Sequence, residues 1–198
     1  MKKRKVIGYG VAVVLIGLLT MCPFVQAADE GPLSQKGTKQ IGVNIGYGYS
    51  FNSNRDIRFA PVYPYIGYVF TDPVGKGWYR GTGECILEGD FNYVYKGQKK
   101  HATGVTMLGR YNFISCGENW RPYLQVGLGI LGTNLTMHNF GSDFNFSEHV
   151  GAGIQYFWNP CNAVNFEWRF RHISNAGIDH DNAGLNLNML LVGYSHTF

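Results

Sequence analysis

The sequence lacks several features that would place it in common protein classes. After residue 27 it has no apolar run of the roughly 18 or more residues that suggest a transmembrane helix. It has no Gly-x-Gly-x-x-Gly motif that opens a helix, which excludes the usual nucleotide-binding fold. Its histidines lack the spacing of a metal site, so we expect no metal and no cofactor. Few stretches have helical periodicity, and the chain is therefore expected to be all-β.

An excess of positive charge is also missing once the N-terminus is set aside. Residues 1–27 are expected to be an export signal that is removed, because a basic start precedes an apolar run from Val11 to Met21 and a small-residue cleavage site near Ala27. This segment holds four of the 17 basic residues and none of the 13 acidic ones, so the rest of the chain has no formal net charge. Nucleic-acid binding gains no support. Residues 28–198 are expected to form one domain.

Cysteine is scarce after the expected signal, with Cys85, Cys116 and Cys161 remaining. Disulfides form in the compartment that an exported chain reaches, so one bridge and one free thiol are compatible with this count. Cys116 and Cys161 both fall in turns expected on the periplasmic side, and a bridge between those turns is one arrangement. Spacing alone leaves the pairing open.

Glycine, tyrosine and phenylalanine are abundant, with 27, 13 and 13 copies. Runs of alternating apolar and small or polar residues recur, each ended by Gly, Asn, Asp or Pro. We expect eight strands: 39–51, 58–70, 84–95, 102–113, 121–132, 144–157, 162–174 and 185–198. An even number of strands of this length is typical of an outer-membrane barrel and exceeds the usual strand length in a soluble sheet.

The two faces of these strands differ in polarity. In a soluble sandwich the apolar face would form the core, whereas in a membrane barrel it would face lipid. Three acidic and three basic residues fall on the polar faces: Glu88, Asp90, Arg110, Glu167, Arg169 and Arg171. These charges can pair inside a narrow barrel of about eight strands, which is filled by side chains. We therefore predict an eight-stranded antiparallel transmembrane β-barrel in the outer membrane, with a solvated sheet as the alternative.

The chain ends in an alternating segment whose last residue is Phe198. Such an ending resembles the signal by which outer-membrane barrels are recognised for insertion. Membrane lipids and the barrel insertion machinery are therefore expected partners. Trp78, Trp120 and Trp158 lie near strand ends, where aromatic girdles meet the membrane interface.

The last expected hairpin carries polar residues on a face that should meet lipid. With both termini in the periplasm, the seventh strand ends at the outer surface. Its apolar face, which includes Trp168 and Phe170, continues to His172 and Ser174. Parity places Asn186 of the next strand on the same face. These polar side chains are expected to converge near the outer leaflet.

A histidine and a serine at this position suggest chemistry. Residues two apart on one strand face lie about 6.5–7 Å apart at their Cα atoms, so the imidazole of His172 can reach the hydroxyl of Ser174. A neutral imidazole can accept the serine proton, which is the pattern of acyl transfer. Polar groups facing lipid are costly unless they pair or act on something there, so the substrate is expected to be a lipid with a carbonyl. A plain turn network in the headgroup region is the alternative.

The segment "RHISNAGIDHDNAGLN", residues 171–186, resembles the signature of the PagL-type lipid A 3-O-deacylases. The motif is confined to His172 through Asn186, and the resemblance in architecture covers most of the remaining chain. It implies a serine esterase in the outer membrane that removes the acyl chain at position 3 of lipid A, the lipid anchor of lipopolysaccharide.

Carried over by position, the resemblance makes Ser174 the nucleophile and His172 the general base. It places Asn175 and Asn182 at motif asparagines, one of which would stabilise the oxyanion together with backbone N–H groups. The family's acid falls at Asn186, which has no negative charge to offer an imidazolium. Substitute acids in the intervening loop are Asp179 and Asp181. The chain would then be a slower dyad enzyme, an enzyme with a displaced acid, or a barrel without activity.

Two other functions compete with the deacylase. A non-enzymatic structural or adhesive barrel would use the motif only as a turn, although the expected outer loops are short to middling in length. A lipid A acyltransferase would need a second acyl pocket, and a crowded, charged interior disfavours one. A homodimer is compatible with the sequence.

Overall fold

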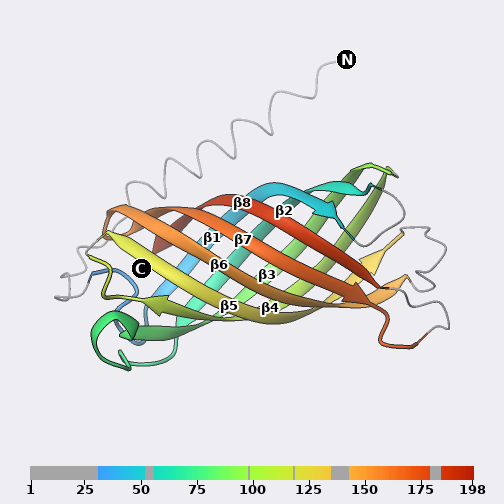
Figure 1. Ribbon diagram of the computed structural model, residues 1–198. Helices are drawn as coiled ribbons and strands as arrows, with labels where there is room; N and C mark the ends of the chain where they lie inside the picture. Colours follow the sequence, from blue (N-terminus) through green and yellow to red (C-terminus); the bar gives the residue numbers. More distant parts are fainter. Residues whose placement is uncertain (1–30, 52–55, 98, 118, 135–142, 179–183) are drawn as a thin grey trace, which may run out of the picture.

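The structure is a computed structural model that describes residues 31–51, 56–97, 99–117, 119–134, 143–178 and 184–198. Within these residues, eight antiparallel strands close into a barrel, with β8 paired to β1 (Figure 1). The elements are β1 (Lys39–Ser50), β2 (Arg58–Val69), the 3-10 helix η1 (Gly77–Tyr79), β3 (Gly81–Lys96), β4 (Lys100–Phe113), β5 (Trp120–Thr133), β6 (Phe144–Asn159), β7 (Asn162–Ser174) and β8 (Leu185–Thr197). The expected export signal, residues 1–27, lies outside the described residues.

The strand pattern read from the sequence is confirmed. β1, β2, β7 and β8 agree with expectation to within one residue at each end. β3 begins at Gly81, earlier than expected, because its pairing with β4 continues until Gly81 lies opposite Phe113. A β-bridge between Gly81 and Val74 also fixes the backbone at this point. No helix in the described part of the chain is long and apolar enough to cross a membrane.

The two faces of the wall have the polarity of a membrane barrel. Large apolar side chains point outward, with Leu128 69%, Met107 62% and Val126 61% exposed. Charged side chains point inward, and Arg169 is fully buried. This arrangement is the reverse of a soluble sandwich, in which the apolar faces would be covered by a second sheet. The expectation of an eight-stranded transmembrane barrel is therefore confirmed.

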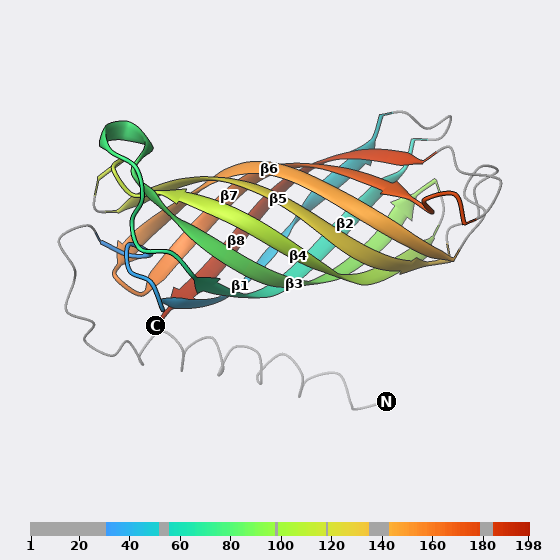
Figure 2. The same cartoon turned by 90° about the horizontal axis from the view of Figure 1, so that it is seen from below.

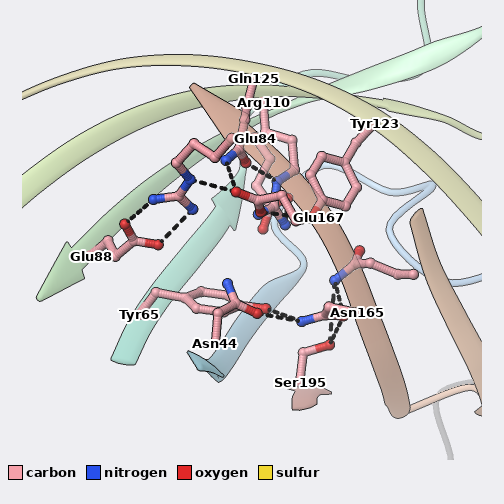
Figure 3. Close-up of polar contacts among 12 residues, drawn as sticks. Asn44, Tyr65, Glu84, Glu88, Arg110, Tyr123, Gln125, Asn165, Glu167 and Ser195 are labelled. Atoms are coloured by element: carbon pink, nitrogen blue, oxygen red, sulfur yellow. Dashed lines mark hydrogen bonds and ion pairs between the residues drawn. The ribbon is translucent and has the colours of Figure 1, made fainter. Parts of the chain in front are cut away.

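Ion pairs fill the interior, and several of them join strands that are not neighbours (Figure 3). The Arg169 guanidinium donates from Nη1 and Nη2 to the two oxygens of Glu88, at 2.5 and 3.0 Å, and from Nε to Glu167 at 2.5 Å. Arg171 pairs with Asp90 in the same way. All six charges expected to face inward are buried. Each carboxylate thus has an arginine nearby in a space that excludes lipid.

One interior acid was not predicted from the sequence, because the expected strand began at that residue. Glu84 is fully buried, and its Oε2 accepts a hydrogen bond from Asn112 at 2.9 Å. Its carboxylate also lies 3.8 Å from Nη1 of Arg110. The earlier start of β3 explains its position, since Glu84 has the same parity as Glu88.

Glycines let large side chains fill the narrow interior. A Cβ added to Gly153 would lie 2.4 Å from the ring of Tyr123, and one added to Gly48 would lie 2.1 Å from the ring of Phe59. Both distances are far below van der Waals contact, so a side chain at either glycine would displace the aromatic ring. The crowded interior expected from the sequence is confirmed.

The ends of the barrel can be assigned from the strand directions. The chain ends beside the start of β1, and η1 lies at the same end of the barrel (Figure 2). At this end Trp78, Trp120 and Trp158 are 78%, 45% and 44% exposed, as expected for an interfacial girdle. β7 ends and β8 begins at the opposite end.

The sequence leaves a bridge between the turns of Cys116 and Cys161 open as one arrangement, and the structure does not contain it, because Cys116 is a free thiol. Cys85 and Cys116 are both free thiols with exposed side chains. Cys161 is buried beneath the β6–β7 turn, where its backbone N–H donates to Oδ1 of Asn159 at 3.0 Å. The two turns therefore hold their cysteines in different environments, one facing solvent and one facing the barrel.

Replacing Arg169 by methionine tests the importance of the interior charges. Glu88 and Glu167 would lose the guanidinium that joins them, and we expect the free energy of unfolding to fall by about 3–5 kcal/mol. Urea unfolding of the barrel in lipid vesicles, followed by tryptophan fluorescence, measures this loss. Arg58→Met is the control, because Arg58 pairs with Asp56 at an exposed edge. Equal losses in the two variants would contradict the prediction.

Candidate active site

The outer ends of β7 and β8 carry the predicted polar residues on the outward face. Trp168 is 47% exposed on β7, and the alternation continues through Phe170 and His172 to Ser174. β7 and β8 are hydrogen-bonded neighbours, and Phe170 lies opposite Asn188 in their register. The next outward position of β7 is His172, which lies directly opposite Asn186. The fold thus brings the histidine and the asparagine together as a cross-strand pair.

A hydrogen bond joins this pair. His172 Nδ1 lies 2.5 Å from Asn186 Oδ1. Because an amide oxygen can only accept, His172 must carry its proton on Nδ1 to make this bond. The neutral ring then has its lone pair on Nε2, which is the form that a general base requires. Asn186 therefore fixes both the tautomer and the orientation of the imidazole.

Ser174 lies two residues beyond His172 on the same half-buried face. Across the sheet it is opposite Phe146 of β6. Among the described residues no hydrogen bond joins Ser174 to His172. Contacts of this kind often tighten only when substrate is bound, so the separation along the strand does not prevent proton transfer.

The chain turns sharply after Ser174. Ala176 and Gly177 have φ values of 53° and 81°, which lie in the left-handed region. The buried side chain of Asn175 stabilises this turn, since its Oδ1 accepts the Gly177 N–H at 2.9 Å. Its backbone carbonyl accepts the Ile178 N–H at 3.1 Å. The turn thus begins directly after Ser174, and the N–H groups of Gly177 and Ile178 are both held by Asn175.

Gly184 leaves room at the free edge of the imidazole. A Cβ on this residue would lie 2.7 Å from His172 Cε1 and 3.2 Å from Nε2. Gly184 also has a φ of 65°, which strains any other residue. A glycine before β8 thus keeps Nε2 accessible.

Apolar side chains surround the polar residues. The Phe51 and Phe170 rings lie 6.0 Å apart, and Phe144 and Phe146 make an edge-on pair at 5.3 Å. Phe51 and Phe146 are 51% and 37% exposed. Such a surface suits the acyl chains of a lipid.

Three predicted residues lie outside the described part of the chain: Asp179, Asp181 and Asn182. Of the others, His172 and Asn186 are in contact, while Ser174 and Asn175 follow on the same strand end. Sequence reasoning missed Glu148 of β6, which lies directly opposite His172. Extending the outward parity of β6 from Phe146 would have found it. No cluster of metal-binding side chains occurs among the residues described.

The fold and this site define a class: an outer-membrane type of small β-barrel with a serine and a histidine on its lipid-facing wall. The chain belongs to the family described as lipid A 3-O-deacylase (PagL), whose model matches residues 64–195, more than half of the chain. That range includes His172, Ser174 and Asn186.

Two curated proteins, each named lipid A deacylase PagL, resemble parts of the chain. The Pseudomonas aeruginosa protein is 29% identical over 116 residues, which are 54% of this chain and 64% of that protein. The Bordetella bronchiseptica protein is 34% identical over 77 residues, which are 37% of this chain and 41% of that protein. The chain thus matches less than two thirds of the length of these relatives.

A solved structure has the same architecture. It is the crystal structure of the outer membrane enzyme PagL, with a TM-score of 0.58 and 19% sequence identity. The similarity covers 79% of this chain and 97% of that one. At this identity the likeness shows the shared fold.

Replacing Gly184 by alanine tests the open edge of His172. We expect the added methyl group to displace the ring and weaken its bond to Asn186, so the Nδ1 proton signal should shift or disappear. NMR of the barrel refolded in detergent micelles with ¹⁵N-labelled histidine measures this signal. Gly177→Ala is a matched control, because Gly177 also has a left-handed φ of 81° but a Cβ there would meet nothing within 4 Å. The same signal change in both variants would show that backbone strain, and not the clash, is responsible.

Proposed function

We propose that this protein is a lipid A 3-O-deacylase of the outer membrane, a serine esterase without a cofactor. Membership of the family supports the reaction and its substrate, lipid A in lipopolysaccharide. The observation that carries the proposal is the bond between His172 Nδ1 and Asn186 Oδ1, which leaves Nε2 free to accept a proton. The outward direction of this site suits a substrate held in the outer leaflet.

In the proposed reaction, Ser174 Oγ attacks the carbonyl carbon of the ester at position 3 of lipid A. The serine proton passes to His172 Nε2, and the carbonyl oxygen becomes an oxyanion. An N–H donor at the oxyanion is worth about 100-fold to 1,000-fold in rate. Asn175, Asn182 and the backbone N–H groups of the turn are the proposed donors.

Collapse of this intermediate breaks the ester. The proton on His172 passes to the departing sugar oxygen, and the acyl chain remains on Ser174. Water then attacks the acyl group, with His172 again accepting and returning a proton. A free fatty acid and a lipid A with a free hydroxyl at position 3 are the products.

The interior disfavours an acyltransferase. Such an enzyme would need to hold a second acyl chain, and the lumen is occupied by buried ion pairs that include Arg169 and Glu88. Hydrolysis needs only water as the acceptor. The deacylase is therefore the better match.

The barrel insertion machinery and a second copy of the chain are the two partners in the proposal. The last strand ends beside β1, and Phe198 is 46% exposed, so this end is available to the insertion machinery before the barrel closes. The homodimer stays a prediction.

Asp179 and Asp181 remain candidate substitute acids.

Alanine substitutions test the proposed roles. We expect Ser174→Ala and His172→Ala each to lower the rate of fatty acid release from lipid A by at least about 1,000-fold. The measurement uses purified, refolded barrel with lipid A in detergent, and the mass of the product identifies the acyl chain removed. His101→Ala is the control, because His101 is an exposed histidine near the outer end of β4.

Two results would contradict the proposal. A folded barrel that releases no fatty acid from several types of lipid A would favour the non-enzymatic barrel. Release that survives Ser174→Ala would require another nucleophile.

A further inference from the structure

The site contains a carboxylate that the family motif does not include. Glu148 of β6 lies opposite His172, and His172 lies opposite Asn186 of β8. The next positions on either side of this row are Leu128 of β5 and Phe51, which follows β1. β6, β7 and β8 lie side by side in the wall (Figure 1). Their register places these three polar residues in one row, with the histidine in the middle.

Glu148 is unusual in its direction. Among the described strand residues it is the one acidic residue that is exposed on the outward face. The other acids of the strands are buried in the lumen: Glu84, Glu88, Asp90 and Glu167. A carboxylate on the lipid-facing side of a barrel is costly unless something compensates for it.

Among the described strand neighbours of Glu148, only His172 can carry a positive charge. Its neighbours on the same face of β6 are Phe146 and Val150, which are 37% and 52% exposed. Its partner on β5 is Leu128. On the remaining side it meets His172. The position therefore makes sense if His172 becomes positively charged.

The proposed reaction produces such a charge. When His172 Nε2 takes the proton of Ser174, the ring becomes an imidazolium, and this cation must be stabilised until the proton passes to the departing sugar oxygen. In a catalytic triad one carboxylate both orients the histidine and balances its charge. Asn186 can orient the ring through Nδ1 but carries no charge. The second task, which is to balance the charge of the imidazolium, therefore needs another residue.

We propose that Glu148 supplies the negative charge that Asn186 lacks, so that the work of the triad acid is divided between the two strands that flank β7. Directly opposite residues have Cβ atoms about 4.5–5.5 Å apart, within the reach of a glutamate side chain. The carboxylate acts across space and needs no bond to either ring nitrogen. The proton moves only between Ser174, His172 and the leaving oxygen.

The environment makes a charge at this distance effective. Attraction between opposite charges grows as the surroundings become less polar, and lipid replaces water on this wall. Glu148 is thus a positioning residue that acts through His172. This inference rests on the proposed deacylase activity.

The first test is Glu148→Gln, which removes the charge and keeps the shape. We expect kcat for fatty acid release to fall by about 10-fold to 100-fold while KM stays the same, because only the charged transition state is affected. Glu148→Asp should retain most of the activity. Asp143→Asn is the matched control, since it removes an exposed acid near the start of β6, away from the row of His172. A difference in mobility between unheated and heated protein in detergent gels confirms that each variant is folded.

The second test moves the charge to the other side of the histidine. Asn186→Glu in the Glu148→Gln background should restore kcat to near that of the unaltered chain, whereas a purely structural role for Glu148 predicts no such rescue. Asn186→Glu alone should bring a smaller gain than it does in this background, because Glu148 already provides a charge.

The outcomes separate this inference from the proposed function. An unaltered chain without activity would refute the deacylase itself. An active chain whose Glu148→Gln variant keeps its kcat would overturn only the role of Glu148. A rise in KM at constant kcat would overturn that role too, and would place the carboxylate against the substrate. Failure of Asn186→Glu to rescue would likewise reject the division of tasks.

Discussion

The pairing of charges inside the lumen is the interaction on which the rest of the structure depends. Arg169 joins Glu88 of β3 to its own strand, and Arg171 joins Asp90 in the same way. These bonds span the barrel, so the strands that carry the active site are tied to the strands on another wall. The same buried side chains occupy the lumen, which disfavours a substrate site within it.

The outer wall is apolar over most of its surface, and this makes its polar exceptions informative. The row of Glu148, His172 and Asn186 comes from three adjacent strands whose register fixes the spacing. Strand pairing is far more rigid than a loop, and it holds His172 and Asn186 opposite each other. Ser174 and the turn at Ala176 lie where β7 ends and the loop to β8 begins. The sheet thus fixes the position of His172, and the end of the strand leaves Ser174 within reach of a substrate.

Much of this could be predicted from the sequence, because alternation is a local property of each strand. It predicted the direction of Arg169, Arg171 and His172, and it placed Asn186 on the same face as His172. Alternation does not specify the register between neighbouring strands, and between β6 and β7 an irregularity near Phe157 shifts that register. A shift of two residues would have placed Phe146 or Val150 opposite His172 instead of Glu148. The role of Gly184 could not be predicted for a related reason, because its distance from the His172 ring depends on the three-dimensional fold. The sequence left the pairing of Cys116 open, because the spacing of cysteines carries no information on their burial.

The position of the site on the outside of a filled barrel has a consequence for how its reaction is governed. A substrate that never leaves the bilayer reaches His172 by lateral diffusion, in two dimensions. For the proposed deacylase, the quantity that sets the rate is then the mole fraction of lipid A in the leaflet and not its amount per volume of solution. The composition of the membrane would thus control the proposed reaction directly.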